Sequence, residues 1–206
     1  MTPPLAAAPR SATDKRAALL AAALRLIARA GLHATPTSAI AREAGVAHGT
    51  LFLYFPTKEA LLNALYLELV SDAHRAATAP AVPTADAAAD PREQLWPLWR
   101  ALARWHLDHA EVNRVIQQLR SSGVLTAETR EAEERAQAEG LAHFREAIAR
   151  GALRDLTLRV FWALYAGPML ALAEANADDG TAAVSDAELR AAFEGVCRSV
   201  LPSDGD

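Results

Sequence analysis

Residues 35–58, TPTSAIAREAGVAHGTLFLYFPTK, decide the fold of this 206-residue chain. Thr35 is the predicted N-cap of a first helix. The proline after it fits the first helical position, where no backbone N–H is needed. Gly45 suits the left-handed end of that helix. A second helix is predicted over residues 48–54, because Pro56 cannot continue it. The stretch therefore predicts two short helices joined by a tight turn.

Two short helices joined by a glycine-containing turn are typical of a helix-turn-helix, whose second helix enters the major groove of DNA. The second helix begins with His48, Gly49 and Thr50, which are small or polar. Such a surface can approach a nucleic-acid backbone closely and hydrogen-bond to it. The alternative is an ordinary helical hairpin. The agreement of the caps, the turn glycine, the aromatic end and Lys58 favours DNA binding.

The stretch resembles the DNA-binding end of TetR-family transcriptional repressors over about the first third of the chain. The residues that carry the resemblance are Thr35, Ile40-Ala41, Ala44-Gly45-Val46, Ala47-His48, Gly49-Thr50, Leu51, Phe52-Leu53-Tyr54, Phe55 and Lys58. The resemblance implies an all-helical DNA-binding homodimer, because two recognition helices then meet successive major grooves of a near-palindrome.

Four positions depart from the usual pattern of the family. Ala47 stands where the family often has Ser or Thr, and Phe52 where it usually has Tyr. His48 replaces a common Lys, Arg or Pro, and Leu53 replaces a residue that is often polar. These departures predict weaker phosphate anchoring or a different operator.

The predicted DNA contacts follow from these positions. Hydroxyl and ammonium groups are expected to bind phosphates. Residues at the outer side of the second helix, together with Ser38 of the first, are expected to meet base edges. The phosphate candidates are Thr35, Thr37, Thr50, Tyr54 and Lys58, and the base candidates are Ser38, His48, Gly49 and Leu53, with Ala47 at the cap position.

Composition favours an all-α protein of about nine helices, since alanine is abundant, β-branched residues are few and 51% of residues are hydrophobic. The net charge of −4 is unevenly distributed: residues 1–79 sum to +3 and the remainder to −7. We therefore expect the N-terminal part to meet DNA. A single cysteine, Cys197, excludes an internal disulfide, and no signal-peptide pattern or membrane-spanning run is seen. These features predict a cytoplasmic protein without a membrane partner.

The predicted organisation has four parts: a disordered tail over 1–12, a helix-turn-helix domain over 13–56, a connecting helix over 57–78 and a ligand-binding and dimerisation domain over 79–206. Helix caps are predicted at Thr13, Thr57 and Asp90. A helix over about 153–175 is apolar nearly all round, so it should be buried on both sides. Together with a last helix capped by Ser185, it predicts a homodimer built as a four-helix bundle. The alternative is a thick monomeric core.

Aromatic residues of the larger domain form a candidate ligand site. They could line an apolar cavity that takes a hydrophobic or aromatic small-molecule effector, with Arg104, His106 or Arg120 as polar contacts. Ordinary core packing is an equal alternative for any one of them. The candidates are Trp96, Trp99, Trp105, Phe144, Phe161, Trp162, Tyr165 and Met169.

Catalytic motifs are absent from the sequence, so we expect no enzyme activity and no cofactor. His106 and His109 have a spacing that could suit a metal, but polar residues at a helix end explain them better. The prediction is a ligand-responsive transcriptional repressor released from a palindromic operator. The alternatives are a small-molecule carrier or enzyme that kept the helical scaffold without DNA binding, and a helical interaction protein.

Overall fold

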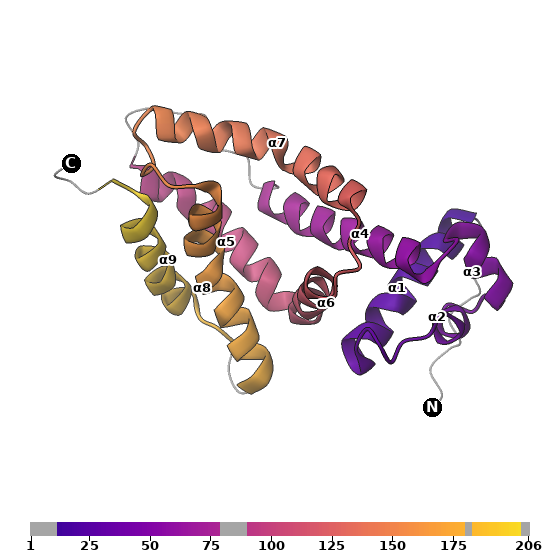
Figure 1. Cartoon of the computed structure of the whole chain (residues 1–206). Coiled ribbons are helices and arrows are strands. Elements are labelled where there is room, and N and C mark those ends of the chain that lie inside the picture. Colours follow the sequence, from indigo (N-terminus) through magenta and orange to yellow (C-terminus); the bar gives the residue numbers. More distant parts are fainter. Residues whose placement is uncertain (1–11, 79–89, 180–182, 203–206) are drawn as a thin grey trace. The chain divides into compact units, whose positions relative to one another are not determined.

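The computed structural model of the chain describes residues 12–78, 90–179 and 183–202 (Figure 1). All regular secondary structure of the described residues is helical, which confirms the predicted all-α class. The helices are α1 (Ala12–Ala30), α2 (Thr37–Glu43), α3 (His48–Tyr54), α4 (Lys58–Thr78), α5 (Pro91–Asp108), α6 (Ala110–Ser121), α7 (Ala127–Ala149), α8 (Leu158–Asp179) and α9 (Asp186–Val200). The predicted tail lies outside the described residues, apart from Ala12, which already belongs to α1.

The chain divides into two compact units. The first unit contains residues 1–70 and 114–132, and the second contains residues 71–113 and 133–206. Residues 114–132, which the sequence analysis assigned to the C-terminal domain, therefore belong with the helix-turn-helix. The chain passes from one unit to the other within α4, α6 and α7.

The first unit is built on amphipathic helices whose apolar residues recur every three or four positions. Each of the helices α1 to α4 contributes side chains that are fully buried or nearly so, and α2 packs against both α1 and α3. This packing fixes the helix-turn-helix, because the short helices α2 and α3 have too few residues to be stable alone. The fully buried side chains of α1–α4 include Leu19, Ile27, Ile40, Leu51, Leu61 and Leu65.

Asn63 attaches the α6–α7 connection to α4 inside the first unit. Its side chain is 8% exposed. Its Nδ2 donates to the carbonyl of Glu59 at 2.8 Å and to that of Val124 at 3.0 Å, and its Oδ1 accepts from the amide of Thr126 at 3.0 Å. A buried amide with all these partners is stabilising, since each lost partner would leave a buried polar group unsatisfied.

The second unit has a core formed by α5, α8 and α9, which lie side by side in Figure 1. Trp99, Met169 and Phe193 are each 0% exposed there. The indole N–H of Trp99 donates to the carbonyl of Tyr165 at 2.9 Å, so its polar atom is satisfied within the core. Burial raises the pKa of the Tyr165 phenol.

Helix ends follow the predicted caps at several points. Thr57 accepts from the amide of Ala60, Asp90 accepts from that of Arg92, and Ser185 forms a capping box with Glu188. Two predicted starts are wrong. Thr13 lies inside α1, one residue after its start, and α8 begins at Leu158, five residues after the predicted start at Leu153. Its first turn is instead capped by Thr157, whose hydroxyl accepts from Val160 N.

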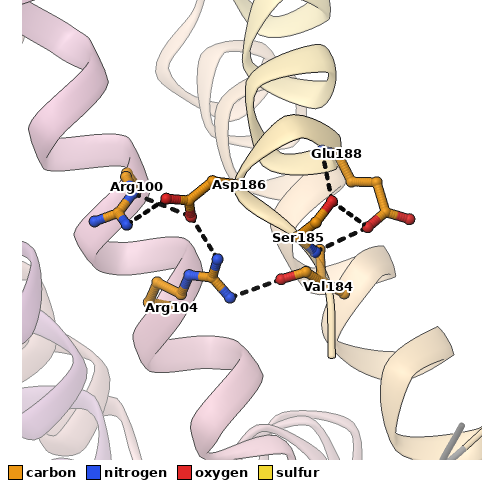
Figure 2. Close-up of polar contacts among 6 residues, drawn as sticks. All are labelled: Arg100, Arg104, Val184, Ser185, Asp186 and Glu188. Atoms are coloured by element: carbon orange, nitrogen blue, oxygen red, sulfur yellow. Dashed lines mark hydrogen bonds and ion pairs between the residues drawn. The ribbon is translucent and has the colours of Figure 1, made fainter. Parts of the chain in front are cut away.

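Asp186 joins the start of α9 to α5 (Figure 2). The guanidinium of Arg100 donates to both of its carboxylate oxygens, at 2.6 and 3.3 Å. Arg104 donates to the same carboxylate and, at 2.7 Å, to the carbonyl of Val184. Hydrogen bonds from Arg100 first, and then from Arg104, lower the pKa of Asp186 to about 2.

We expect Asp186→Asn to change the pH dependence of stability at acidic pH. A lowered folded-state pKa stabilises the fold above the unfolded value of about 3.9, and this contribution is lost as the pH falls through about 2. The Tm of the wild type should therefore fall more steeply between about pH 4 and pH 2 than that of Asp186→Asn, as measured by circular dichroism. Asp155→Asn, at an exposed carboxylate of the same unit, is the control. Parallel curves for wild type and Asp186→Asn would contradict the expectation.

Candidate nucleic-acid interface

The turn between α2 and α3 is set by Gly45, whose φ is +69°. The amide of Gly45 donates to the carbonyl of Arg42 at 3.1 Å, and the amide of Val46 donates to that of Ala41 at 3.0 Å. These two bonds are those of a Schellman motif, in which the left-handed residue is usually glycine. The predicted role of Gly45 as a helix end is confirmed.

Helix α3 has a buried side and an outward side. Leu51 is 0% exposed and holds the helix against the core of the first unit. Gly49 and Leu53 lie two positions before and after it, so helical geometry places both on the opposite side. Leu53 is 83% exposed and Phe52 is 42% exposed. The outward side of α3 therefore presents apolar as well as polar groups to the solvent.

His48 is held at the start of α3. Its Nε2 is 3.1 Å from the hydroxyl of Thr37 in α2, in a hydrogen bond whose direction depends on the imidazole tautomer. Its ring also meets the edge of Phe52, with centroids 5.1 Å apart and an angle of 67° between the planes. The imidazole is thus fixed by both helices of the motif while remaining exposed.

Thr35 is not placed as predicted. The N-cap position of α2 is Pro36, with no side-chain cap hydrogen bond, and Thr35 precedes it. Thr35 is 1% exposed, and its hydroxyl donates to the carbonyl of Gly31 at 2.8 Å. The prediction of Thr35 as a cap is therefore wrong. Its predicted contact with a phosphate is not supported by a hydroxyl that is buried and hydrogen-bonded inside the first unit.

Lys58 has a structural contact that its sequence context does not predict. Its ammonium group donates to the carbonyl of Leu32 at 3.1 Å. The amide of Leu32 donates to the side-chain oxygen of Gln118 at 3.2 Å. Both polar backbone groups of Leu32 are thereby held, which fixes the segment that leads into α2. An ammonium has three donors, so this contact leaves Lys58 able to meet a phosphate as well.

The other predicted contact residues of the first unit lie at its surface or partly so. Ser38, Ala47, His48, Gly49 and Leu53 are exposed, and Thr37, Thr50, Tyr54 and Lys58 are half-buried. Phe52 was not among the predicted contacts, although it is exposed beside His48. Its place in the aromatic pair around Leu53 is the signal that could have identified it.

Ion pairs within the first unit occupy some of its cations, although the net charge already counts the acids involved. Glu43 accepts from Arg25 at 3.1 Å and lies 3.6 Å from Arg29. Arg16 pairs with Glu68 at 3.4 Å. All three pairs are exposed, so each contributes little to stability. They do compensate charges that would otherwise attract DNA phosphates.

The candidate ligand residues fall into several environments of the second unit. Trp99, Tyr165 and Met169 lie in its core, and Trp96 packs partly buried against Trp99 and Phe193. Phe161 stacks on Tyr165 with centroids 5.2 Å apart, whereas Trp162 is 43% exposed. Trp105 stacks on His109 at 4.7 Å. The side chain of Phe144 lies outside the described residues.

The three polar groups predicted beside these aromatic residues already have protein partners. Arg104 binds Asp186, and Nδ1 of His106 lies 2.7 Å from Oδ1 of Asn113. Burial is the main cause that lowers the pKa of His106. Arg120 belongs to the first unit, where its Nε donates to the hydroxyl of Tyr66 at 2.8 Å.

No metal-like cluster of three His, Cys, Asp or Glu side chains occurs in the described part of the chain. Among the same residues, no helix is both long and apolar enough to cross a bilayer.

Comparisons with known proteins agree with the geometry of the first unit. Residues 19–65 match the family model described as "Bacterial regulatory proteins, tetR family". A 50-residue stretch is 46% identical to part of the fatty acid metabolism regulator protein of Bacillus subtilis (strain 168). This stretch covers 24% of the present chain and 26% of that protein. The chain thus matches about a quarter of that relative's length.

Solved structures extend the likeness to nearly the whole chain. A TetR family transcription regulator from Marinobacter aquaeolei VT8 aligns with a TM-score of 0.80 at 26% identity, covering 91% of this chain and 96% of that one. A tetR family transcription regulator from Shewanella sp. PV-4 aligns with a TM-score of 0.78 at 28% identity, covering 94% and 100%.

Proposed function

Because the chain belongs to the TetR family of transcription regulators, we propose that it is a repressor that binds a near-palindromic operator as a homodimer and leaves it when a hydrophobic or aromatic small molecule binds. The observation that carries the DNA-binding part is the outward side of α3. It presents His48, Gly49 and Leu53 to solvent, while Leu51 anchors the helix from behind.

In this proposal both helices of the motif, α2 and α3, contact the DNA. The hydroxyls of Thr37 and Thr50 and the phenol of Tyr54 meet phosphates, which position the protein on the duplex. The exposed side of α3 meets base edges in the major groove, with His48 and Leu53 as its largest side chains. Thr37 also fixes the His48 ring, so one threonine would orient the residue that reads DNA.

The exposed sides of α8 and α9 support the proposed dimer. Their core sides are covered, yet Val160 and Trp162 of α8 are each 43% exposed. Small residues follow the sides that face away from the core, which lets helices of two subunits approach closely. They are Ala163, Gly167 and Ala171 in α8, and Ala187, Ala191 and Gly195 in α9.

The proposed effector class rests on the aromatic residues of the second unit. Phe161, Trp162 and Tyr165 contact one another through their rings. Such surroundings favour an apolar or aromatic ligand. The name of the Bacillus subtilis relative does not narrow this class, because its identity to this chain is confined to 50 residues.

The function is tested by a gel shift with duplex DNA from the region upstream of the protein's own gene. His48→Ala should weaken the shift by about tenfold or more, since a good contact to a base contributes about 1–3 kcal/mol. Thr50→Ala should also weaken it, because a contact that positions the protein on a phosphate is lost. His109→Ala, an exposed histidine of the second unit, is the matched control and should bind as the wild type does. If the wild type binds no DNA at low salt, or if all the variants bind equally, the proposal is wrong.

Ala163→Arg and Ala191→Arg are expected to convert the dimer to monomers. Each places a long cation on a helix side that the proposed interface buries, where an unpaired charge is costly. Sedimentation velocity should show the mass of one chain for both variants and of two chains for the wild type. Ala21→Arg, at an exposed alanine of α1, should leave the mass unchanged. A wild type that sediments as a monomer would contradict the proposed dimer.

A further inference from the structure

Gly49 has no role that the fold itself explains. It lies within α3 rather than at a turn, and glycine destabilises a helix interior relative to alanine. A Cβ atom added there would meet nothing within 4 Å. Since neither backbone geometry nor a neighbouring atom of the chain requires a glycine, the reason for its small size lies outside the chain, in a body that approaches α3 closely.

Leu53 follows Gly49 by one helical turn and shares its side of α3. A helical side chain leans toward the N-terminus, so that of Leu53 covers the turn that contains Gly49. Leu53 is 83% exposed, which is the highest exposed fraction among the large hydrophobic side chains of the described residues. Exposed leucine is unfavourable in water, and its side chain can neither donate a hydrogen bond to a phosphate nor accept one from a base.

The side chains beside Leu53 have contacts within the protein. Phe52 is half as exposed as Leu53, and its ring contacts the ring of His48. His48 is in turn held by the hydroxyl of Thr37. These contacts restrain the two rings beside Leu53, and that leucine is the most exposed apolar side chain of α3.

In the major groove, the group that matches an apolar side chain is the C5 methyl of thymine. We propose that Leu53 reads the C5 methyl group of a thymine and that Gly49 leaves the room in which that base approaches α3. The inference rests on the proposed DNA-binding function and deepens it. It specifies an A·T pair at one symmetric position of each operator half-site.

The test pairs a methyl group on the DNA with the side chain that is proposed to contact it. Duplexes are taken from a random-pool selection against the wild type, and each thymine in turn is replaced by deoxyuridine, which lacks only the C5 methyl. Binding of the wild type and Leu53→Ala is measured by fluorescence anisotropy. At one symmetric position, the replacement should weaken wild-type binding about fourfold per half-site, as expected for one buried methyl group, and should leave Leu53→Ala unaffected.

Two controls keep the outcome specific. His109→Ala, at an exposed residue of the second unit, should keep the full response to deoxyuridine. Circular dichroism should show the same helicity for Leu53→Ala as for the wild type, because so exposed a side chain contributes little to folding. If duplexes are selected but deoxyuridine costs the same with and without Leu53 at every position, the inference is overturned and the proposed function stands. If no duplex is selected, both fail.

Discussion

Gly49→Glu is expected to weaken operator binding by about 100-fold or more, since like charges brought together at an interface cost several kcal/mol. The added carboxylate would lie on the outward side of α3, where we propose that the DNA approaches. Nothing in the chain opposes the change, because a Cβ at this position meets no atom within 4 Å. Anisotropy titrations at a fixed salt concentration measure the binding, and circular dichroism checks that the helices are retained.

Gly49→Ala separates the DNA contact from folding. Alanine should stabilise α3 by about 0.5–1 kcal/mol relative to glycine. It should nonetheless weaken DNA binding, because its methyl group occupies space that the proposed interface needs. Opposite signs for stability and binding are the expected result. If Gly49→Ala binds as tightly as the wild type and Gly49→Glu loses only a few-fold, α3 does not approach DNA through this side.

Asn63→Leu is expected to destabilise the first unit by about 1–3 kcal/mol, the cost of leaving the polar groups of a partly buried contact without a partner. Leucine fills a similar volume but leaves the carbonyl of Val124 and the amide of Thr126 without their partner. Denaturant unfolding measures the loss. Hydrogen exchange at the Thr126 amide locates it, since this amide should lose protection first.

Asn63→Asp is the matched variant for this prediction. A carboxylate still accepts from the Thr126 amide but cannot donate to the carbonyls of Glu59 and Val124. Its exchange protection at Thr126 should therefore exceed that of Asn63→Leu. A free energy of unfolding within about 0.5 kcal/mol of the wild type for Asn63→Leu is the range of an ordinary surface substitution and would contradict a stabilising role for this contact.

The helix-turn-helix could be predicted because its signals are local. Gly45 occupies the one left-handed position of the turn, and Pro56 ends the segment that contains α3. Caps at Thr57, Asp90 and Ser185 likewise depend on residues within three positions, so the sequence alone identified them. The alternation between buried Leu51 and exposed Leu53 follows from helical periodicity.

Contacts between distant residues could not be predicted in the same way. Leu32 and Gln118 are 86 positions apart, and nothing in either neighbourhood indicates their hydrogen bond. Thr35 misled for another reason: a threonine before a proline is typical of a cap, but its side chain is buried and its hydroxyl donates to the carbonyl of Gly31. Asn63 did carry a signal, since it interrupts a run of leucines on the buried side of α4.

The aromatic residues of the second unit show a different limit. Trp99 satisfies its N–H within the core through the carbonyl of Tyr165, a backbone group that sequence reasoning cannot place. Composition could thus identify the aromatic set but could not separate residues that pack the core from those that remain accessible, such as Trp162.

Selection of bound DNA from a random pool tests most directly whether two copies of α3 read DNA from a two-fold dimer. The expected result is a near-palindrome whose half-sites are centred about one helical turn apart or a multiple of it. The same selection with Gly49→Glu should enrich no sequence. A wild-type pool that enriches a single unrepeated site, or a variant pool that enriches the same sequence, would contradict reading by a symmetric pair of α3 helices.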